Sequence, residues 1–189
     1  KFLKILSSNF GKKILKIQKE VFKISKKEFN IASPKQLGEI LYNDLKIADL
    51  KKTKKGSFAT SASVLEDLAF KGHKFPQLVL DWRQVSKLKN TYSDSLPEHI
   101  NPNTKRVHTS FLLAATTTGR LASSDPNLQN IPIKSEDGKD IRKAFIAKKD
   151  HVLISADYNQ IEMRILADLA DVKGLKKAFK NNEDIHSLT

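Results

Sequence analysis

The chain has 189 residues, 39% of them hydrophobic, so it is long enough to bury a core and form one sizeable domain or two small ones. It contains no cysteine, which excludes disulfides, thiolate zinc sites and cysteine nucleophiles, and it has no apolar run long enough to span a membrane. Lysine and arginine total 34 against 21 acidic residues, and the resulting net charge of +13 is typical of nucleic-acid-binding proteins, although basic surfaces also meet anionic membranes.

The first predicted element is an amphipathic helix within residues 2–29, where apolar residues recur every three or four positions. Lysines interleave with these apolar residues from the start, unlike a signal peptide, which favours a cytoplasmic location. Because the apolar stripe is broad, we expect it to pack on a neighbour, although basic amphipathic helices can also bind membranes. The stripe consists of Leu3, Leu6, Phe10, Ile14, Ile17, Val21 and Ile24.

A second helix is predicted to begin at Ser33-Pro34 and to run to about Leu45, since a capping serine followed by proline is typical of a helix start. Residues 46–61 are rich in lysine, serine and threonine without a sustained period, which predicts a loop. Ser61 or Ser63 is then expected to cap a short helix.

Residues 75–96 are predicted to form a long helix with Arg83, Lys87 and Lys89 on its polar side. Lysine-rich helices suit phosphate binding, because phosphate contacts supply affinity without reading base sequence. A solvated charged face accounts for these residues equally well. The apolar side contains Leu78, Trp82, Val85, Leu88 and Tyr92.

After Pro97 the pattern changes to short β-like runs at residues 106–113 and 151–156, which predicts a domain boundary near residue 97. The second run leads to Asp157, followed by apolar residues at helical spacing. Asp157 could simply cap that helix. Capping does not account for the polar residues that follow it in order, which are Tyr158, Gln160, Glu162 and Arg164.

Residues 157–164, with the sequence DYNQIEMR, resemble the first palm motif of family A DNA polymerases. The segment TTTGRLASSDPNLQNIP, residues 116–132, is similar to the family's segment beside the minor groove of the primer-template. Residues 51–92 resemble the thumb, and residues 183–186 resemble the segment after the first motif. The resemblance implies an α+β fold, with a mainly helical thumb in residues 1–96 and a partial palm of antiparallel strands and helices in residues 97–189.

For chemistry, the resemblance implies a DNA-directed DNA polymerase of the bacterial polymerase I type, which uses two Mg²⁺ ions. Asp157 is expected to bridge both ions and the carbonyl of Tyr158 to add a ligand, while the second essential aspartate belongs to a later motif. Glu162 is expected to lie under the incoming sugar and exclude a 2′-hydroxyl. The implied catalytic residues are Asp157 and Glu162, and the implied nucleotide-binding residues are Tyr158, Gln160, Glu162 and His186.

For DNA binding, the minor groove offers acceptors at nearly equivalent places for every base pair, so polar donors there can check pair geometry without choosing a sequence. Local turn capping is the competing explanation for the polar residues of segment 116–132, and it accounts for Ser123, Ser124 and Asp125. The resemblance implies that Arg120, Asn127, Gln129, Asn130 and Lys134 contact DNA from residues 116–134. From the thumb it implies Arg83, Lys87, Lys89, Asn90 and Thr91, and from the thumb tip Lys52, Thr53, Lys54, Thr60 and Ser61.

The expected partners are primer-template duplex DNA and deoxynucleoside triphosphates, bound by a monomer that lies in the bacterial cytoplasm with the nucleoid and serves replication and repair. An alternative is a non-catalytic duplex-binding module, because the fingers and the second catalytic aspartate are not in this sequence. A third hypothesis is a single-subunit RNA polymerase or another palm enzyme. Glu162 and residues 116–132 speak against that third hypothesis.

Overall fold

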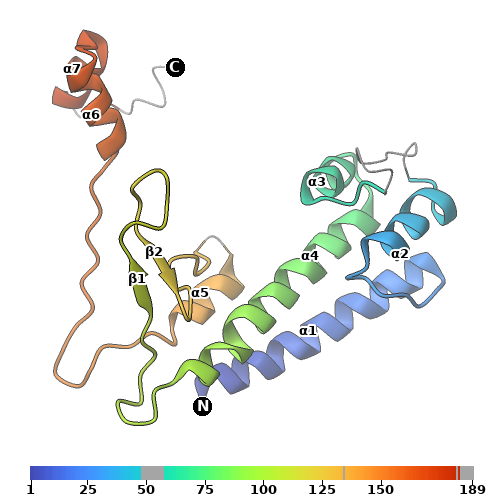
Figure 1. Cartoon of the computed structure of the whole chain (residues 1–189). Coiled ribbons are helices and arrows are strands. Elements are labelled where there is room, and N and C mark those ends of the chain that lie inside the picture. The colour runs from blue at the N-terminus through green and yellow to red at the C-terminus, as the bar shows by residue number, and fades with distance from the viewer. Residues whose placement is uncertain (48–57, 134, 182, 184–189) are drawn as a thin grey trace. The chain divides into compact units, whose positions relative to one another are not determined.

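The computed structural model of the chain describes residues 1–47, 58–133, 135–181 and 183. The chain divides into two compact units after Phe145 (Figure 1). Among the described residues, no helix is both long enough and apolar enough to cross a membrane.

The first unit is built on two long helices that pack side by side, α1 (Phe2–Ser25) and α4 (Lys74–Leu88) (Figure 1). The apolar stripe predicted for α1 is confirmed, because its members are buried or packed against the core. The helix ends at Ser25, before Phe29, since Lys26 adopts a left-handed conformation with φ 56°. The fully buried part of the stripe consists of Leu6, Phe10, Ile17 and Val21.

The predicted second helix is present as α2 (Pro34–Gly38) followed by a π-helix, η1 (Glu39–Asp44). The predicted cap is confirmed, since the Ser33 hydroxyl accepts a hydrogen bond from the Gln36 amide at 3.4 Å.

The next helix, α3 (Ala62–Phe70), packs on α4. Ser61 occupies the predicted N-cap position, but its hydroxyl lies 3.1 Å from the Ser63 hydroxyl and makes no cap bond to the backbone. Most of the predicted loop at 46–61 lies outside the described residues.

The long helix predicted at 75–96 is observed as α4 continued by a π-helix, η2 (Lys89–Asp94), and a 3₁₀ turn, η3 (Leu96–His99). Its apolar side is confirmed as core, since Leu78, Val85, Leu88 and Tyr92 are buried and Trp82 packs against them.

Two short strands follow, β1 (Ser110–Leu112) and β2 (Ala122–Ser124), paired antiparallel with Ser110 opposite Ser124. The run predicted at 106–113 is therefore a strand only in its last part. Helix α5 (Glu136–Arg142) then buries Ile141 in the same core as α1 and α4. Because Leu128, Ile131, Ile141 and Phe145 pack in the core of the long helices, the compact units differ from the predicted division at residue 97.

The second unit begins with an extended segment that the structure does not form into the strand predicted at 151–156. Val152, Leu153 and Ile154 are 79%, 69% and 87% exposed, and no described residue pairs with them. A strand needs a hydrogen-bonded neighbour as well as alternating side chains, which is why the sequence prediction is wrong for this structure.

Two helices complete the second unit, α6 (Ile161–Leu169) and α7 (Lys173–Lys180). They pack through Ala167 and Ala178, and the guanidinium carbon of Arg164 lies 4.4 Å from the ring centroid of Phe179. With its helices and small antiparallel sheet, the chain has the predicted α+β fold.

Candidate nucleic-acid interface

The segment at residues 116–132 is organised by a buried serine at its turn. The Ser123 hydroxyl donates to Asn127 Oδ1 at 3.1 Å and accepts from the Leu128 amide at 3.2 Å. Asn127 Oδ1 also accepts from the Gln129 amide at 3.0 Å. Asn127, predicted to meet DNA, therefore also holds the shape of this turn, and turn capping extends beyond residues 123–125.

Further side chains bind the backbone of the same segment. The Thr109 hydroxyl lies 3.0 Å from the carbonyl of Ser124 and 2.7 Å from that of Pro126. The Gln129 side-chain amide donates to the Leu121 carbonyl at 3.0 Å, which links the two ends of the turn. Because the backbone is held from several sides, the segment is pre-organised before any ligand binds.

The end of the segment is fastened to the helices at three successive carbonyls. The Tyr92 hydroxyl donates to the carbonyl of Asn130, and Arg142 donates through Nε to Pro132 and through Nη2 to Ile131, both at 3.1 Å. Burial raises the pKa of Tyr92 above its ordinary value, which keeps the hydroxyl protonated as a donor. Sequence reasoning missed Tyr92, Thr109 and Arg142, because each bonds to main-chain atoms that no side-chain pattern reveals.

The side chains of Arg120 and Asn130 are exposed near the two ends of this segment. Both are donors of the kind expected beside a minor groove. Lys134, also predicted there, lies outside the described residues.

The predicted thumb residues fall into two groups. Lys87, Asn90 and Thr91 are exposed, as a phosphate contact requires. Arg83 instead donates to the carbonyl of Thr60 at 2.8 Å, and burial lowers the pKa of its guanidinium. Thr60 is only 6% exposed, so the structure disagrees with its predicted place on a DNA-facing surface.

Lys89 is also engaged within the protein. Its ammonium lies 2.6 Å from Asp94 Oδ2, while the Ser7 hydroxyl donates to Asp94 Oδ1 at 2.5 Å. Burial alone would raise the pKa of Asp94, but the hydrogen bonds from Lys89 and Ser7 and the charge of Lys89 outweigh it and lower the pKa. This cluster ties α1 to η2.

Ser61 is exposed at the start of α3. The remaining predicted tip residues, Lys52, Thr53 and Lys54, lie outside the described residues.

The residues predicted for catalysis lie on the extended segment and on the first turn of α6. Asp157 and Tyr158 are exposed, and helix α6 begins only at Ile161, with Gln160 at its N-cap in a left-handed conformation of φ 53°. Asp157 therefore does not cap the helix. Glu162 lies in the first turn, where an acid is favoured by the helix dipole. His186 lies outside the described residues.

The donor atoms at this segment suit Mg²⁺, which prefers carboxylate and carbonyl oxygens and keeps several waters. Asp157 supplies the carboxylate and Tyr158 the carbonyl. Within the described residues, however, no group of three or more acidic, histidine or cysteine side chains lies close enough together to hold a metal. Asp157 and Tyr158 therefore provide the kinds of ligand atom that Mg²⁺ prefers, but they do not form a complete binding site for the ion.

Comparisons with known proteins agree with these motifs. The family model described as DNA polymerase family A matches residues 1–189. The chain is 52% identical over 184 residues to DNA polymerase I of Rhizobium leguminosarum, covering 97% of this chain and 18% of that protein. It is 53% identical over 177 residues to DNA polymerase I of Caldicellulosiruptor bescii, covering 94% of this chain and 21% of that protein.

A solved structure, the POL domain of Pol1 from M. smegmatis in complex with DNA primer-template and dNTP, is similar to the chain with a TM-score of 0.87 and 40% identity. The similarity covers 98% of this chain and 33% of that one. The chain spans about a fifth of the length of the curated relatives it matches. Since the family model matches the whole sequence, the chain belongs to DNA polymerase family A.

Proposed function

We propose that this chain forms the duplex-holding and primer-terminus part of a DNA-directed DNA polymerase that performs template-directed nucleotidyl transfer. The observation that carries the proposal is its similarity, over 98% of its length, to a polymerase domain described in complex with primer-template DNA and dNTP. The proposal includes a monomer located with the DNA in the bacterial cytoplasm, acting in replication and repair.

In this proposal residues 116–132 lie along the minor groove of the primer-template. Arg120 and Asn130 present donors from a backbone whose carbonyls are held at Arg120 by the Thr116 hydroxyl and at Asn130 by the Tyr92 hydroxyl. Donors held in fixed positions can bind the minor-groove acceptors that all base pairs have at nearly equivalent places, so they support DNA binding without sequence preference. Phosphate contacts would come from the exposed Lys87, with Asn90 and Thr91 beside it.

At the primer terminus, Asp157 and the carbonyl of Tyr158 would supply oxygen ligands to Mg²⁺, whose chemistry is to stabilise the attacking and leaving oxygens of the transfer. The exposed Tyr158 ring and the Glu162 carboxylate are proposed to border the nucleotide sugar, together with Gln160. Glu162 would exclude a 2′-hydroxyl by its bulk and thereby favour deoxynucleotides.

A second candidate function is duplex DNA binding without chemistry. It is favoured by the net charge of +13, because phosphate contacts supply affinity for DNA without requiring any chemistry. The two candidates differ in whether this chain can support catalysis when joined to the remaining parts of a family A polymerase.

That difference can be tested by exchange. The chain would replace the matching segment of the R. leguminosarum polymerase, to which it is 52% identical over 184 residues. The proposal predicts that the chimera extends a primer on a DNA template. A chimera that binds primer-template as tightly as its parent and extends no primer would favour the second candidate.

A further inference from the structure

Four lysines form a row on one face of α1, and their role is not explained by the proposed interface. Lys12, Lys16, Lys19 and Lys23 follow one another at spacings of four, three and four residues. At about 100° per residue they fall within roughly 30° of one line along the helix, and at about 1.5 Å per residue the row is roughly 16 Å long. We call these four residues the basic row.

The basic row forms no ion pair in the described part of the chain, although Glu20 lies one helical turn from two of its lysines. All four lysines are exposed, and none makes an ion pair or hydrogen bond with a described residue. The one acidic residue of α1, Glu20, lies 3.5 Å from Lys74, and the neighbouring Lys13 lies 2.5 Å from Asp137.

The row also lies on the side of α1 opposite its core face. The buried Leu6, Phe10, Ile17 and Val21 fall on the other side of the helical wheel, where α1 packs on α4. The lysines therefore point away from α4, and the proposed phosphate contact at Lys87 belongs to a different surface.

The row weakens the helix that carries it. Like charges three and four residues apart repel one another on a helix surface, and here the pairs are Lys12 with Lys16, Lys16 with Lys19, and Lys19 with Lys23. Packing of the opposite face compensates for this repulsion in the free protein. A bound polyanion would remove it.

We propose that the basic row binds the phosphate backbone of duplex DNA, as a second contact distinct from residues 116–132 and α4. This inference rests on the proposed function in one respect, that the chain meets duplex DNA. Lysines are point charges on flexible stems, and a straight row of them suits a phosphate backbone without reading bases.

A membrane surface fits the row less well than DNA does. Helices that lie on membranes insert an apolar face into the headgroup region, and the apolar face of α1 is used in the protein core. The exposed large apolar side chains of α1 are Phe2, Ile5 and Leu15, at 44%, 60% and 59% exposure. A partner would therefore bind the basic row through its charge rather than through apolar surface.

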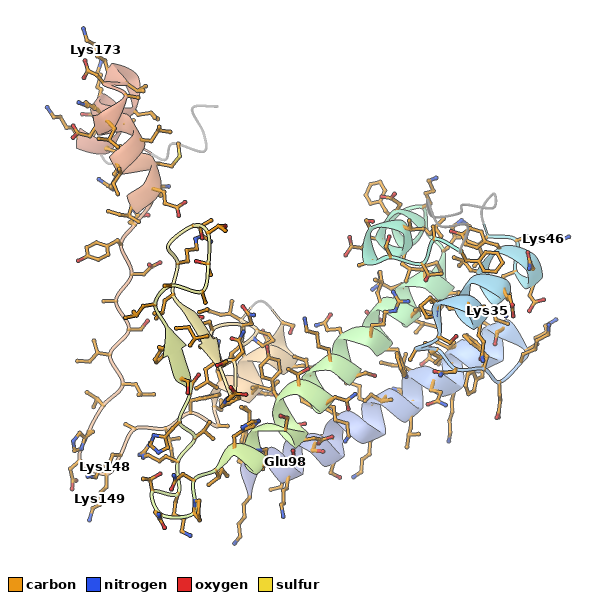
Figure 2. All side chains as sticks on the ribbon, viewed as in Figure 1. Lys35, Lys46, Glu98, Lys148, Lys149 and Lys173 are labelled. Atoms are coloured by element: carbon orange, nitrogen blue, oxygen red, sulfur yellow. The ribbon has the colours of Figure 1, made fainter. Side chains whose placement is uncertain are left out.

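The test compares two variants of the full 189-residue chain that carry the same net charge. The row variant is Lys12→Gln, Lys16→Gln, Lys19→Gln and Lys23→Gln. The control variant changes four exposed lysines away from α1, Lys35, Lys148, Lys149 and Lys173, which are labelled in Figure 2, to Gln. Each variant loses four charges, from +13 to +9.

Binding of a fluorescently labelled duplex is followed by anisotropy over a range of salt concentrations. Since each neutralised phosphate contributes about 0.9 to the slope of log affinity against log salt, the row variant is expected to lose about 3 to 4 from that slope, and the control less than about 1. Equal slopes in the two variants would overturn the proposal, and so would a wild-type chain that does not bind the duplex. The proposal would also be overturned if anionic phospholipid vesicles bound the wild-type chain and the control variant but not the row variant, while the row variant bound duplex DNA as the wild type does.

Folding of the row variant is checked by circular dichroism and thermal unfolding, where removal of the repulsion predicts stability at least equal to wild type. A Lys→Arg version of the same four positions keeps the charge and should keep the wild-type slope; a reduced slope there would overturn the proposal independently of folding. If the chimera extends no primer, the proposed polymerase function is contradicted, whereas the comparison of salt slopes between the row variant and the control variant remains valid.

Discussion

The hydroxyl of Tyr92 donates a hydrogen bond to the main-chain carbonyl of Asn130. This bond joins η2, at the end of the long helix α4, to the segment proposed to lie along the minor groove. The two residues are 38 positions apart and were predicted to belong to different domains, yet both lie in the unit Lys1–Phe145. The position of the proposed DNA-binding segment is therefore fixed in part by its hydrogen bond to η2.

Replacing Tyr92 by Phe removes only the hydroxyl and leaves the buried ring in place. Because the carbonyl of Asn130 loses its donor, we expect the free energy of unfolding in urea to fall by about 1–2 kcal/mol. Hydrogen exchange should become faster at the amides of residues 128–131, because the hydrogen bond that holds the carbonyl of Asn130 is lost.

The control for this substitution is Tyr42→Phe. The Tyr42 hydroxyl also donates to a carbonyl, that of Ala59, at 2.7 Å, and burial likewise raises its pKa. A similar loss of stability is expected, without faster hydrogen exchange at the amides of residues 128–131. If both variants change exchange there equally, Tyr92 has no particular role in holding the segment.

Substitutions of Arg83 and Lys87 should affect different properties, stability in the case of Arg83 and DNA binding in the case of Lys87. Arg83→Gln loses the bond to the Thr60 carbonyl and is expected to lower the free energy of unfolding by about 1 kcal/mol. Lys87→Gln removes an exposed charge and should leave stability unchanged while reducing the salt slope of duplex binding by about 1. Chemical unfolding and anisotropy measure the two effects, and a reversed pattern would contradict these assignments.

The pKa of Asp94 predicts a dependence of stability on pH. It is lowered in the folded state, so the ionised carboxylate stabilises the fold above the ordinary value of 3.8, and this contribution is lost as the pH falls through the folded-state pKa. Asp94→Asn should therefore destabilise the chain at pH 7 and make progressively less difference below about pH 4.

The control for Asp94 is Asp67→Asn on α3, whose carboxylate makes no hydrogen bond or ion pair with any described residue. Its effect on urea unfolding at pH 7 should be small, because no hydrogen bond or ion pair is lost. A stability difference for Asp94→Asn that persists unchanged at low pH would exclude the ion pair with Lys89 as its source.

The helices of the first unit could be predicted from the sequence because each has a strong local signal. The apolar stripe of α1 and the Ser33-Pro34 start of α2 depend on residues near one another in the chain. The π-helical continuations η1 and η2 could not be predicted, since they change backbone hydrogen bonding without changing the apolar pattern.

Contacts between residues far apart in the chain could not be predicted from the sequence. Residues 151–156 alternate as a strand does, yet the structure leaves them extended and unpaired among the described residues. Arg83 was grouped with the DNA-facing lysines, and its bond to Thr60 depends on how α3 and α4 pack. For the proposed site, residue types were predictable from motifs, while the side chains that hold their backbone were not.

Glu162→Ala in the chimera tests the proposed exclusion of ribonucleotides. Removing the bulky carboxylate should raise the efficiency of ribonucleotide incorporation relative to deoxynucleotide incorporation by at least about tenfold, a difference of about 1.4 kcal/mol in the barrier. Glu183→Ala, an exposed acid on the same unit, is the control. Unchanged discrimination in Glu162→Ala would refute the steric role.

The most direct test of the polymerase function is single-turnover primer extension by the chimera with and without Asp157→Ala. The account predicts extension by the unsubstituted chimera and a loss of at least about a thousandfold in rate for Asp157→Ala, with primer-template affinity retained. Asp168→Ala, which removes a carboxylate 3.0 Å from Lys176 on the same unit, should extend primers normally. Normal extension by the Asp157→Ala chimera would contradict the assignment of this residue to catalysis.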